Sequence, residues 1–362
     1  MANVKEMNLP GSTRRRTYRG CVHVHSTFSD GSGSIPEIAE AANDASLDFV
    51  ILNDHNTLRA LEDGWEGRRE GVLLLVGAEL STTAGHYLAF DLPPGFRCDR
   101  TGPQETIDRV NASGGFGILA HPTAQETWKD WSVSGYAGVE ISNLVSLFDT
   151  AGRKNAAGVL LDFARTGFRE CGNGIRRVMS RGSGESRALW AGLLAEGKCV
   201  GLGGTDVHAN LRLGPFRLHI PSYREALRSL QVHVQSPDEM AGDLERDKRL
   251  VYGALREGRC FTVYSAWADP EGFDFAAESG GMEAAMGESV SLNGGVVTLS
   301  AEAPAGAPAE IRFLRDRALV HSHEGNSASF EVREAGAYRA EVWLRVGKGL
   351  VPWIVGNPIY VG

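Results

Sequence analysis

Short apolar runs alternate with helical patterns from Tyr18 to about Ala266. This alternation is typical of α/β architecture, in which parallel strands are joined by helices. The first helix is well marked, because Ser34-Ile35-Pro36-Glu37 has the form of a capping box and precedes apolar residues at helical spacing. We predict further helices over Gln104–Ala112, Ala156–Thr166, Ser186–Glu196 and Leu244–Glu257, and strands over Gly20–His25, Phe49–Asn53, Leu73–Ala78, Tyr87–Asp91, Phe116–Ala120, Ala137–Ile141 and Cys199–Gly203.

The pattern changes after Asp269, where helical spacing gives way to short alternating segments. Tyr338, Ala340, Val342 and Leu344 fall on one face of such a segment, and charged residues fall on the other. A chain of 362 residues has room for about two domains at roughly 150 residues each. We therefore expect an α/β domain over residues 1–268 and a small all-β sandwich over residues 269–362.

Charge and composition narrow the classes of function. The chain has 37 Lys and Arg residues against 45 Asp and Glu residues, so its net charge of -8 disfavours nucleic acid and anionic lipid as partners. The sequence shows no signal-peptide pattern and no apolar run long enough to cross a membrane. Five scattered cysteines without a C-x-x-C spacing argue against a disulfide framework and a thiolate zinc site. We expect a cytoplasmic protein with a small-molecule substrate, and its oligomeric state stays open.

Histidines are concentrated beside the predicted strands. His23 and His25 are two residues apart, so in an extended strand both rings would leave the same face. Asp206 and His208 repeat this spacing after another apolar run.

Three more polar residues follow apolar runs: His55, Glu79 and His121. In parallel α/β folds the ligand crevice lies at the carboxyl ends of the strands, so these side chains should converge. A single histidine in such a place is more often part of the core or the surface, but five strands with the same feature favour a shared site. Imidazoles and carboxylates without thiolates suit zinc, manganese or iron(II).

These motifs resemble those of the PHP family, named for its polymerase and histidinol phosphatase domains. The resemblance runs in order from about Arg19 to Ala266. Its motifs are H-x-H with a following acid (His23, His25, Asp30), D-H (Asp54-His55), G-x-E (Gly77 to Glu79), H-P (His121-Pro122) and D-x-H (Asp206 to His208).

The resemblance implies a distorted (β/α)7 barrel that holds two or three divalent metal ions. It places His23, His25, Glu79 and Asp206 at one ion, with Glu79 bridging to a second. The second ion would also be bound by His86 and His121, and the third by Asp30, His55 and His208. His86 precedes its strand and rests on the resemblance of Gly85-His86 alone, so a simple turn histidine is the alternative.

Other polar residues are candidates for supporting roles. Asp54 would orient a ligand imidazole, since such rings usually need their other nitrogen held by a carboxylate or carbonyl. Glu140 and Asn143 end another strand, where a supporting or substrate contact competes with simple solvation. Arg176 and Arg177 lie in a Gly-rich basic stretch that could clamp an anionic substrate, although a solvated loop is the commoner reading. We expect His219, His233, His321 and His323 at the surface.

The predicted function is metal-dependent hydrolysis, with a phosphoesterase that uses a metal-bridging hydroxide as the leading hypothesis. Glu79, Asp206 and His208 are the expected catalytic residues, and the substrate would be an anionic phosphate ester. The ending Val351 to Tyr360 resembles a carbamate-hydrolase-like branch of the family, so a carbamate or ester hydrolase is the runner-up. A metal-binding accessory module without activity is the third hypothesis. Signatures of zinc proteases, α/β-hydrolases, P-loop NTPases and dinucleotide enzymes are missing from the sequence.

Overall fold

The structure, a computed structural model, describes residues 15–123, 128–147, 175–176, 178–179, 184–213, 216–218, 221–292 and 295–362. Its helices are α1 (Ile35–Asp44), α2 (Arg59–Glu62), α3 (Pro103–Ala112), α6 (Gly184–Leu194), α7 (Tyr223–Leu227) and α8 (Leu244–Glu257). The strands of the first part are β1 (Arg16–Val24), β2 (Phe49–Leu52), β3 (Gly67–Arg69), β4 (Val72–Val76), β5 (Ala78–Ser81), β6 (His86–Phe90), β7 (Phe116–Leu119), β8 (Gly138–Asn143), β9 (Val200–Gly204), β10 (Leu211–Leu213), β11 (Phe216–Leu218), β12 (Gln231–Ser236) and β13 (Cys260–Val263). The remaining strands are β14 (Asp274–Ser279), β15 (Met282–Ala285), β16 (Ser289–Val290), β17 (Val297–Glu302), β18 (Ala309–Arg315), β19 (Ala318–Glu324), β20 (Ser327–Val332), β21 (Gly336–Val346), β22 (Gly349–Gly356) and β23 (Ile359–Val361).

The first part of the chain is a mixed α/β structure built on two sheets. In one sheet β1, β2 and β4 are parallel neighbours, and β12 and β13 continue it in antiparallel pairing. The other sheet has the order β5-β6-β7-β8-β9. Isolated bridges at Val24–Val207 and His55–Glu79 link strand ends of the two sheets in the part of the chain that the structure describes. The α/β class is confirmed, and the (β/α)7 barrel stays a prediction.

Most predicted elements coincide with observed ones, and α8 has the predicted bounds. Ser34 and Glu37 form the expected capping box of α1, with Glu37 Oε2 accepting from the Ser34 amide at 2.8 Å. The expectation of parallel strands is wrong for β6, which pairs antiparallel with β5 and β7. A hairpin connection needs only a few residues, and Thr82 to Gly85 provide it. The predicted helix over Ala156–Thr166 lies outside the described residues.

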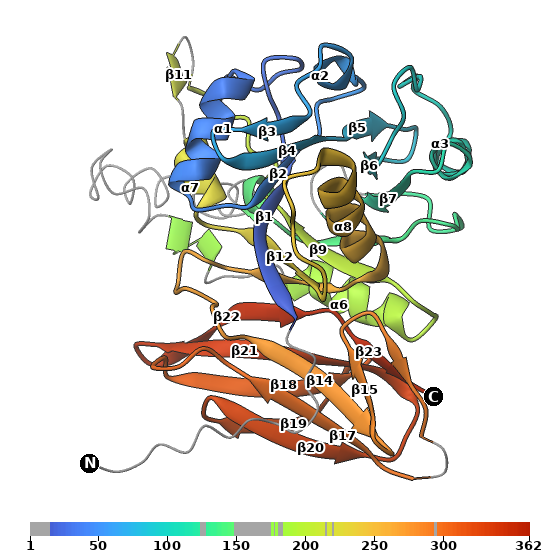
Figure 1. Cartoon of the computed structure of the whole chain (residues 1–362), viewed down its shortest axis with the longest axis vertical. Helices are drawn as coiled ribbons and strands as arrows, with labels where there is room; N and C mark the ends of the chain where they lie inside the picture. Colours follow the sequence, from blue (N-terminus) through green and yellow to red (C-terminus); the bar gives the residue numbers. More distant parts are fainter. Residues whose placement is uncertain are drawn as a thin grey trace.

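The C-terminal strands form the antiparallel layers expected after Asp269. A four-stranded sheet, β15-β14-β17-β20, faces the strands β18, β21 and β22 across a second apolar core (Figure 1). Phe261 and Val263 of β13 belong to this core. Because β13 pairs with β22, one sheet continues from the first part of the chain into the C-terminal part. The division after residue 268 stays a prediction.

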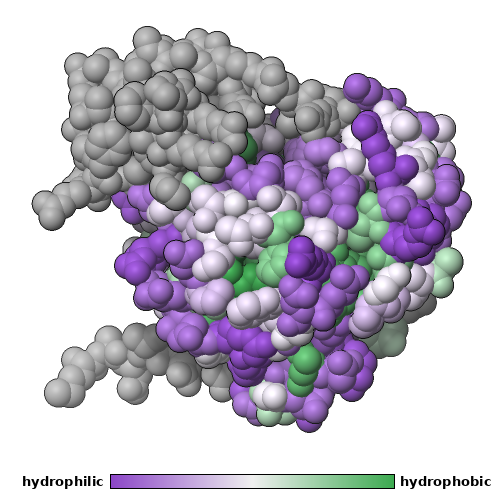
Figure 2. All heavy atoms as spheres, turned by 90° about the horizontal axis from the view of Figure 1, so that it is seen from above, coloured by the Kyte–Doolittle hydropathy of each residue, from purple (hydrophilic) through white to green (hydrophobic). Residues whose placement is uncertain are grey.

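The surface seen from above is mainly hydrophilic, with hydrophobic residues gathered near the middle of this face (Figure 2). Few large apolar side chains are exposed among the described residues: Trp131, Met282, Leu319 and Val346. Within that part of the chain, no helix has the length and apolar character that crossing a membrane requires.

Candidate metal centre

Glu79 lies at the middle of the histidine cluster. Its Oε2 lies 3.2 Å from the Nε2 atoms of both His23 and His25, and 3.2 Å from His55 Nδ1. Its Oε1 lies 2.9 Å from His86 Nδ1 and 3.0 Å from His121 Nε2. The carboxylate is buried and faces five imidazoles, so each of its oxygens can serve a different group of ligands.

Asp206 closes a buried group with the first two histidines. Its Oδ1 lies 3.3 Å from the Nε2 atoms of both His23 and His25. His23, His25, Glu79 and Asp206 each place one donor atom within 4.8 Å of the others. The structure therefore brings together the four residues that the resemblance assigned to one ion.

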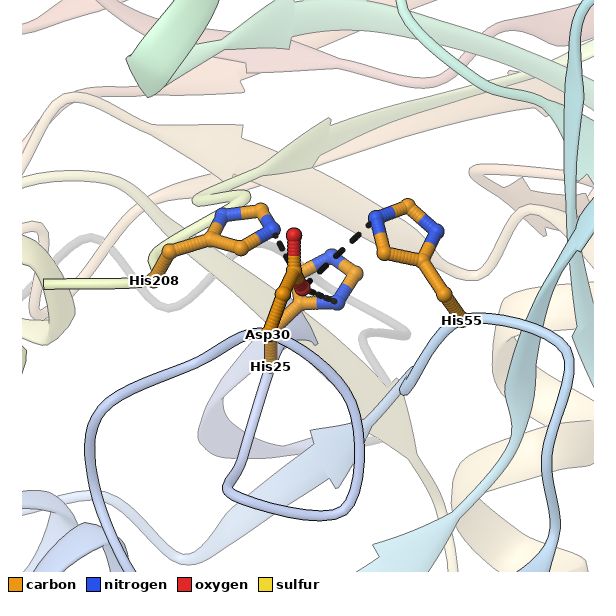
Figure 3. A group of neighbouring side chains, drawn as sticks. All are labelled: His25, Asp30, His55 and His208. Carbon is orange, nitrogen blue, oxygen red and sulfur yellow. Dashed lines mark ion pairs between the residues drawn. The ribbon is translucent and has the colours of Figure 1, made fainter. Parts of the chain in front are cut away.

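Asp30 forms a second, more open group with three histidines (Figure 3). Its Oδ1 lies 3.1 Å from His208 Nε2, 3.8 Å from His55 Nε2 and 3.9 Å from His25 Nδ1. In Figure 3 His55 and His208 approach this carboxylate from opposite sides, on loops that follow β2 and β9. The Asp30 side chain is 57% exposed, so this group opens to solvent whereas the Glu79 group is closed.

The backbone that carries His23 and Asp206 into the site is irregular and is not an extended strand. The register of β1 against β2 shifts between Cys21 and Val24, and His23 has a φ of 62°. Asp206 has a φ of 54° and lies beyond the end of β9. The expectation of an extended strand is wrong for both pairs, because non-glycine residues in the left-handed region interrupt it, but the His23 and His25 rings both face Glu79. Such conformations cost free energy and are typical of functional sites.

Glu140 on β8 organises the inner side of the site. Its Oε1 lies 2.8 Å from His23 Nδ1, and its Oε2 accepts from the His121 amide at 2.7 Å and from Asn143 Nδ2 at 3.0 Å. When His23 Nδ1 donates to Glu140, the neutral ring presents an unprotonated Nε2 toward Glu79, as a metal ligand requires. Asn143 Nδ2 also donates to Asp206 Oδ2 at 3.2 Å.

Asp54 supports a loop rather than an imidazole. Its Oδ1 accepts from the Ser26 amide at 2.8 Å and from Ser29 Oγ at 2.6 Å, and its Oδ2 accepts from Ser26 Oγ at 2.6 Å. The expectation that Asp54 holds a ligand ring is therefore wrong, because three donors of the loop before Asp30 already bind this carboxylate. Glu140 has the predicted orienting role instead.

Further residues hold the strand ends and were missed by the sequence patterns. Asn53 Oδ1 accepts from the His23 amide at 3.0 Å, and the Tyr223 hydroxyl donates to the His25 carbonyl at 2.7 Å. Asn53 could have been suspected from its place beside Asp54 and His55. Tyr223 lies almost 200 positions from His25 in the chain, and no spacing signals it.

Contacts between the imidazoles and the carboxylates determine the protonation of the site when no metal is bound. Burial opposes protonation of His25 and His121, but contacts with Glu79 and Asp206 raise the pKa of each ring to about 9. Burial likewise opposes charge on His23, yet the carboxylates of Asp206, Glu79 and Glu140 hold its pKa well above the usual value. Burial disfavours the charged form of Asp30, but its contact with His208 lowers its pKa to about 2.

The donor set fits divalent metal ions. The Nε2 atoms of His23 and His25, together with Glu79 Oε2, are buried and have no hydrogen-bond partner among the described residues. Buried polar atoms in folded proteins almost always have a hydrogen-bond partner. Unpaired nitrogen and oxygen atoms gathered around one point therefore indicate a place for a metal ion. Imidazole and carboxylate donors without thiolates are typical of zinc, manganese and iron.

The remaining predicted residues lie elsewhere. Arg176 is exposed and donates to the Ala266 carbonyl at 2.6 Å, and Arg177 lies outside the described residues, as does His219. His323 is exposed, and His321 stacks on Phe330 with ring centroids 4.7 Å apart. His233 is not at the surface as expected: it is buried in β12, where burial lowers its pKa to about 3.

No protein-family model matches the chain. An uncharacterized protein of Methanocaldococcus jannaschii, MJ1587, is 30% identical over 118 residues, which cover 28% of this chain and 66% of that protein. The matched part of the chain thus spans just under two thirds of that relative's length.

Three solved structures are similar to the chain. The first is a two-domain protein of Bacteroides vulgatus with a predicted PHP-like metal-dependent phosphoesterase; it is 14% identical over 95% of both chains, with a TM-score of 0.44. The second, from Bifidobacterium adolescentis and provisionally assigned as a metal-dependent phosphoesterase, is 16% identical over 57% of this chain and 95% of its own, with a TM-score of 0.36. The third is an amidohydrolase of Chromobacterium violaceum with bound sulfate and no metal, 14% identical over 52% of this chain and 87% of its own, with a TM-score of 0.35.

All three identities lie below 25% and all three TM-scores below 0.5, so the proposals below rest on the geometry of the site. The resemblance to the PHP family is carried by the sequence motifs of the chain.

Proposed function

We propose that the protein is a metal-dependent hydrolase that cleaves a phosphate ester of a small molecule. The observation that carries this proposal is the position of Glu79, whose two carboxylate oxygens face different imidazoles. A carboxylate shared in this way could serve as a ligand on each side and would partly neutralise the charge of bound ions. Divalent ions, when bound, would supply Lewis-acid stabilisation of a phosphoryl oxygen and a water molecule acidic enough to react at neutral pH.

The ligand sets that we propose are those implied by the sequence motifs, and the contacts of Glu79, Asp206 and Asp30 described above support them. His23, His25, Glu79 and Asp206 would hold one ion, and the other side of Glu79 would hold a second with His86 and His121. Asp30, His55 and His208 would hold a third, more exposed ion. Zinc, manganese or iron would fit these donors, and nine ligand residues suffice for two to three ions with open positions.

The protein's own residues have distinct tasks in this proposal. Glu79 and Asp206 would hold the ions, while Glu140 contacts the His23 ring and Asn143 donates to both Glu140 and Asp206. His208 lies at the open side beside Asp30, where an anionic substrate would arrive, and the Asp206 carbonyl 2.7 Å from its Nδ1 holds the ring so that Nε2 faces this side. Residues 1–268 would carry this chemistry, and residues 269–362 would support it.

The test is a hydrolysis screen of the metal-loaded protein over phosphomonoesters, phosphodiesters and aryl carbamates. Turnover of phosphate esters alone would support the proposal. Turnover of carbamates alone would instead favour the carbamate or ester hydrolase, since the same centre can polarise a carbonyl. If the fully metal-loaded protein hydrolyses none of these substrates, a metal-binding accessory module would be favoured.

Metal content and two carboxamide variants sharpen this screen. We expect more than one equivalent of transition metal in protein purified without chelator. Glu79→Gln and Asp206→Asn should lower turnover by more than about 100-fold, because even residues that only orient a ligand contribute about 10- to 100-fold. His323→Ala, an exposed histidine outside the site, is the matched control and should retain full turnover. Near-normal rates in both carboxamide variants would contradict the assignment.

A further inference from the structure

A second cluster of charged side chains lies outside the metal centre, between α6 and the outer face of β18 and β21. Arg187, Arg312, Arg317, Arg339 and Glu341 line a cavity of about 300 Å³ there. The alternation along β21 placed Arg339 and Glu341 on a solvent-facing side, yet they are only 3% and 4% exposed. Packing of α6 over this face explains the burial, since the Arg339 guanidinium lies 5.2 Å from the Trp190 ring of that helix.

Positive charge exceeds negative charge in this cavity. Glu341 is shared by Arg187 at 3.5 Å and Arg339 at 3.2 Å, and Arg312 binds Glu310 at 2.6 Å. Arg317 has neither an ion pair nor a hydrogen bond within the described ranges. Four guanidinium groups therefore meet Glu341 and Glu310, and the charge of Asp316 also acts on Arg339. Arg317 is exposed and lacks a counter-ion in the part of the chain that the structure describes, so an anion that enters from solvent would meet an unpaired guanidinium group.

The guanidinium groups are also held in place before any ligand binds. Arg312 and Arg187 lie 4.2 and 5.2 Å from the ring centroid of Trp343. Gly192 leaves space for Arg317, because a Cβ at this position would lie 2.2 Å from Arg317 Nη2.

One donor in the cluster is left without a partner. The Arg187 side chain is only 12% exposed, and its Nε atom is buried with no hydrogen-bond partner among the described residues. A buried guanidinium N–H without a partner lowers the stability of the fold, unless a bound ligand accepts a hydrogen bond from it.

We propose that this cavity is a second binding site, which takes a small molecule carrying a phosphate-type dianion. The excess of guanidinium groups over carboxylates favours an anion, and guanidinium forks bind phosphate oxygens in pairs. Leu314, Leu319 and Ala188 provide an apolar wall for the rest of the molecule. A volume of about 300 Å³ is at the lower end for small-molecule sites and suits a compact ligand. This inference does not depend on the chemistry of the metal centre.

The test uses phenylphosphonate, whose carbon–phosphorus bond resists hydrolysis, as the probe in calorimetric titrations of the full-length, metal-loaded protein. Arg317→Gln should raise the Kd of one binding step by at least about tenfold, because a charge-assisted contact is lost. Arg317 is exposed, so this variant should fold and keep its metal. Arg333→Gln removes an equally exposed arginine outside the cavity and should bind as the unmodified protein does.

A binding step at the metal centre would be insensitive to Arg317→Gln and sensitive to Glu79→Gln, so the two sites can be separated. Titrations that are identical for the unmodified protein and Arg317→Gln would overturn the proposal. Benzoate has a similar ring but a single charge. Equal affinity for benzoate at the step that depends on Arg317 would overturn the assignment to a dianion.

Discussion

At the scale of single residues, the arrangement of the candidate metal centre requires small residues at positions where a larger side chain would displace its carboxylates. Gly204 is one such position, because a Cβ there would lie 1.8 Å from Glu140 Oε1 and 2.9 Å from His23 Cβ. The Glu140 oxygen concerned is the one that contacts His23 Nδ1. Glycine at the end of β9 therefore allows Glu140 to reach the imidazole.

We expect Gly204→Ala to push Glu140 away from His23 and to lower metal affinity by about 10- to 100-fold, the usual effect of losing a group that orients a ligand. Gly197→Ala is the control, because a Cβ at Gly197 meets no atom within 4 Å. Metal content after dialysis and turnover of both variants measure the effect. Full metal retention in Gly204→Ala would show that Glu140 does not position His23.

Protonation of individual histidines predicts how the metal-free protein responds to pH. The pKa values of His25 and His121 are raised from 6.5 to about 9 by buried carboxylates, so these rings stabilise the folded state fully below pH 6.5. That contribution is lost as the pH rises through about 9. Metal binding has the opposite trend, since ligand imidazoles must first release their protons.

We therefore expect the melting temperature of chelator-treated protein to fall between pH 6.5 and pH 9, while metal affinity increases over the same range. Thermal unfolding at several pH values and metal titration in weak buffers test both trends. Glu79→Gln removes the central carboxylate and should flatten the alkaline decline. A melting temperature independent of pH in the unmodified protein would contradict the ion-pair arrangement.

At the scale of elements, the loop from Ser26 to Asp30 is held by one carboxylate. Asp54 accepts three hydrogen bonds from Ser26 and Ser29, and the loop presents Asp30 to His208. The buried group around Glu79 does not share these contacts. The exposed group should therefore be separable from the buried one.

Asp54→Ala should release this loop and cost about one equivalent of bound metal, while the remaining metal stays. Asp130→Ala is a matched control, because Asp130 also accepts from a serine amide and hydroxyl, those of Ser132, in an exposed turn. Elemental analysis after extensive dialysis measures the difference. Loss of all metal, or of none, would show that the two groups are not independent.

Elements with a strong local signal could be predicted, and those defined by distant contacts could not. Helix α8 has a capping aspartate, an amphipathic pattern and a terminating glycine, so its bounds follow from nearby residues. Strand β12 has polar residues at alternate positions, yet all six of its residues are buried, because other elements, α8 and β9 among them, pack against this strand. The candidate ligand residues were signalled by their places at strand ends. The left-handed backbone of His23 and Asp206 depends on contacts across the fold and left no trace in the sequence.

At the scale of the whole molecule, the C-terminal strands are joined to the sheets that carry the site. The Asn357 side chain accepts from the Gly201 amide at 2.8 Å and donates to the Gly201 carbonyl at 3.0 Å and the Cys260 carbonyl at 2.9 Å. This residue is 1% exposed and bridges β9 to β13. The Tyr360 hydroxyl adds a bond from the Cys199 amide at 3.2 Å. No ligand group includes a residue after 268 within the described part of the chain.

These contacts predict that stability and metal binding can be separated. Asn357→Ala would leave buried backbone groups of Gly201 and Cys260 unsatisfied, so we expect the free energy of unfolding to fall by roughly 2 kcal/mol or more. Metal content of the folded variant should be unchanged, because its ligands belong to the first part of the chain. Urea unfolding and elemental analysis measure the two quantities. Asn326→Ala is the control, because its side chain, in the turn between β19 and β20, donates to the Pro304 carbonyl and not to β9 or β13. Loss of metal from folded Asn357→Ala would show that the C-terminal strands hold the centre together and do not only stabilise the fold.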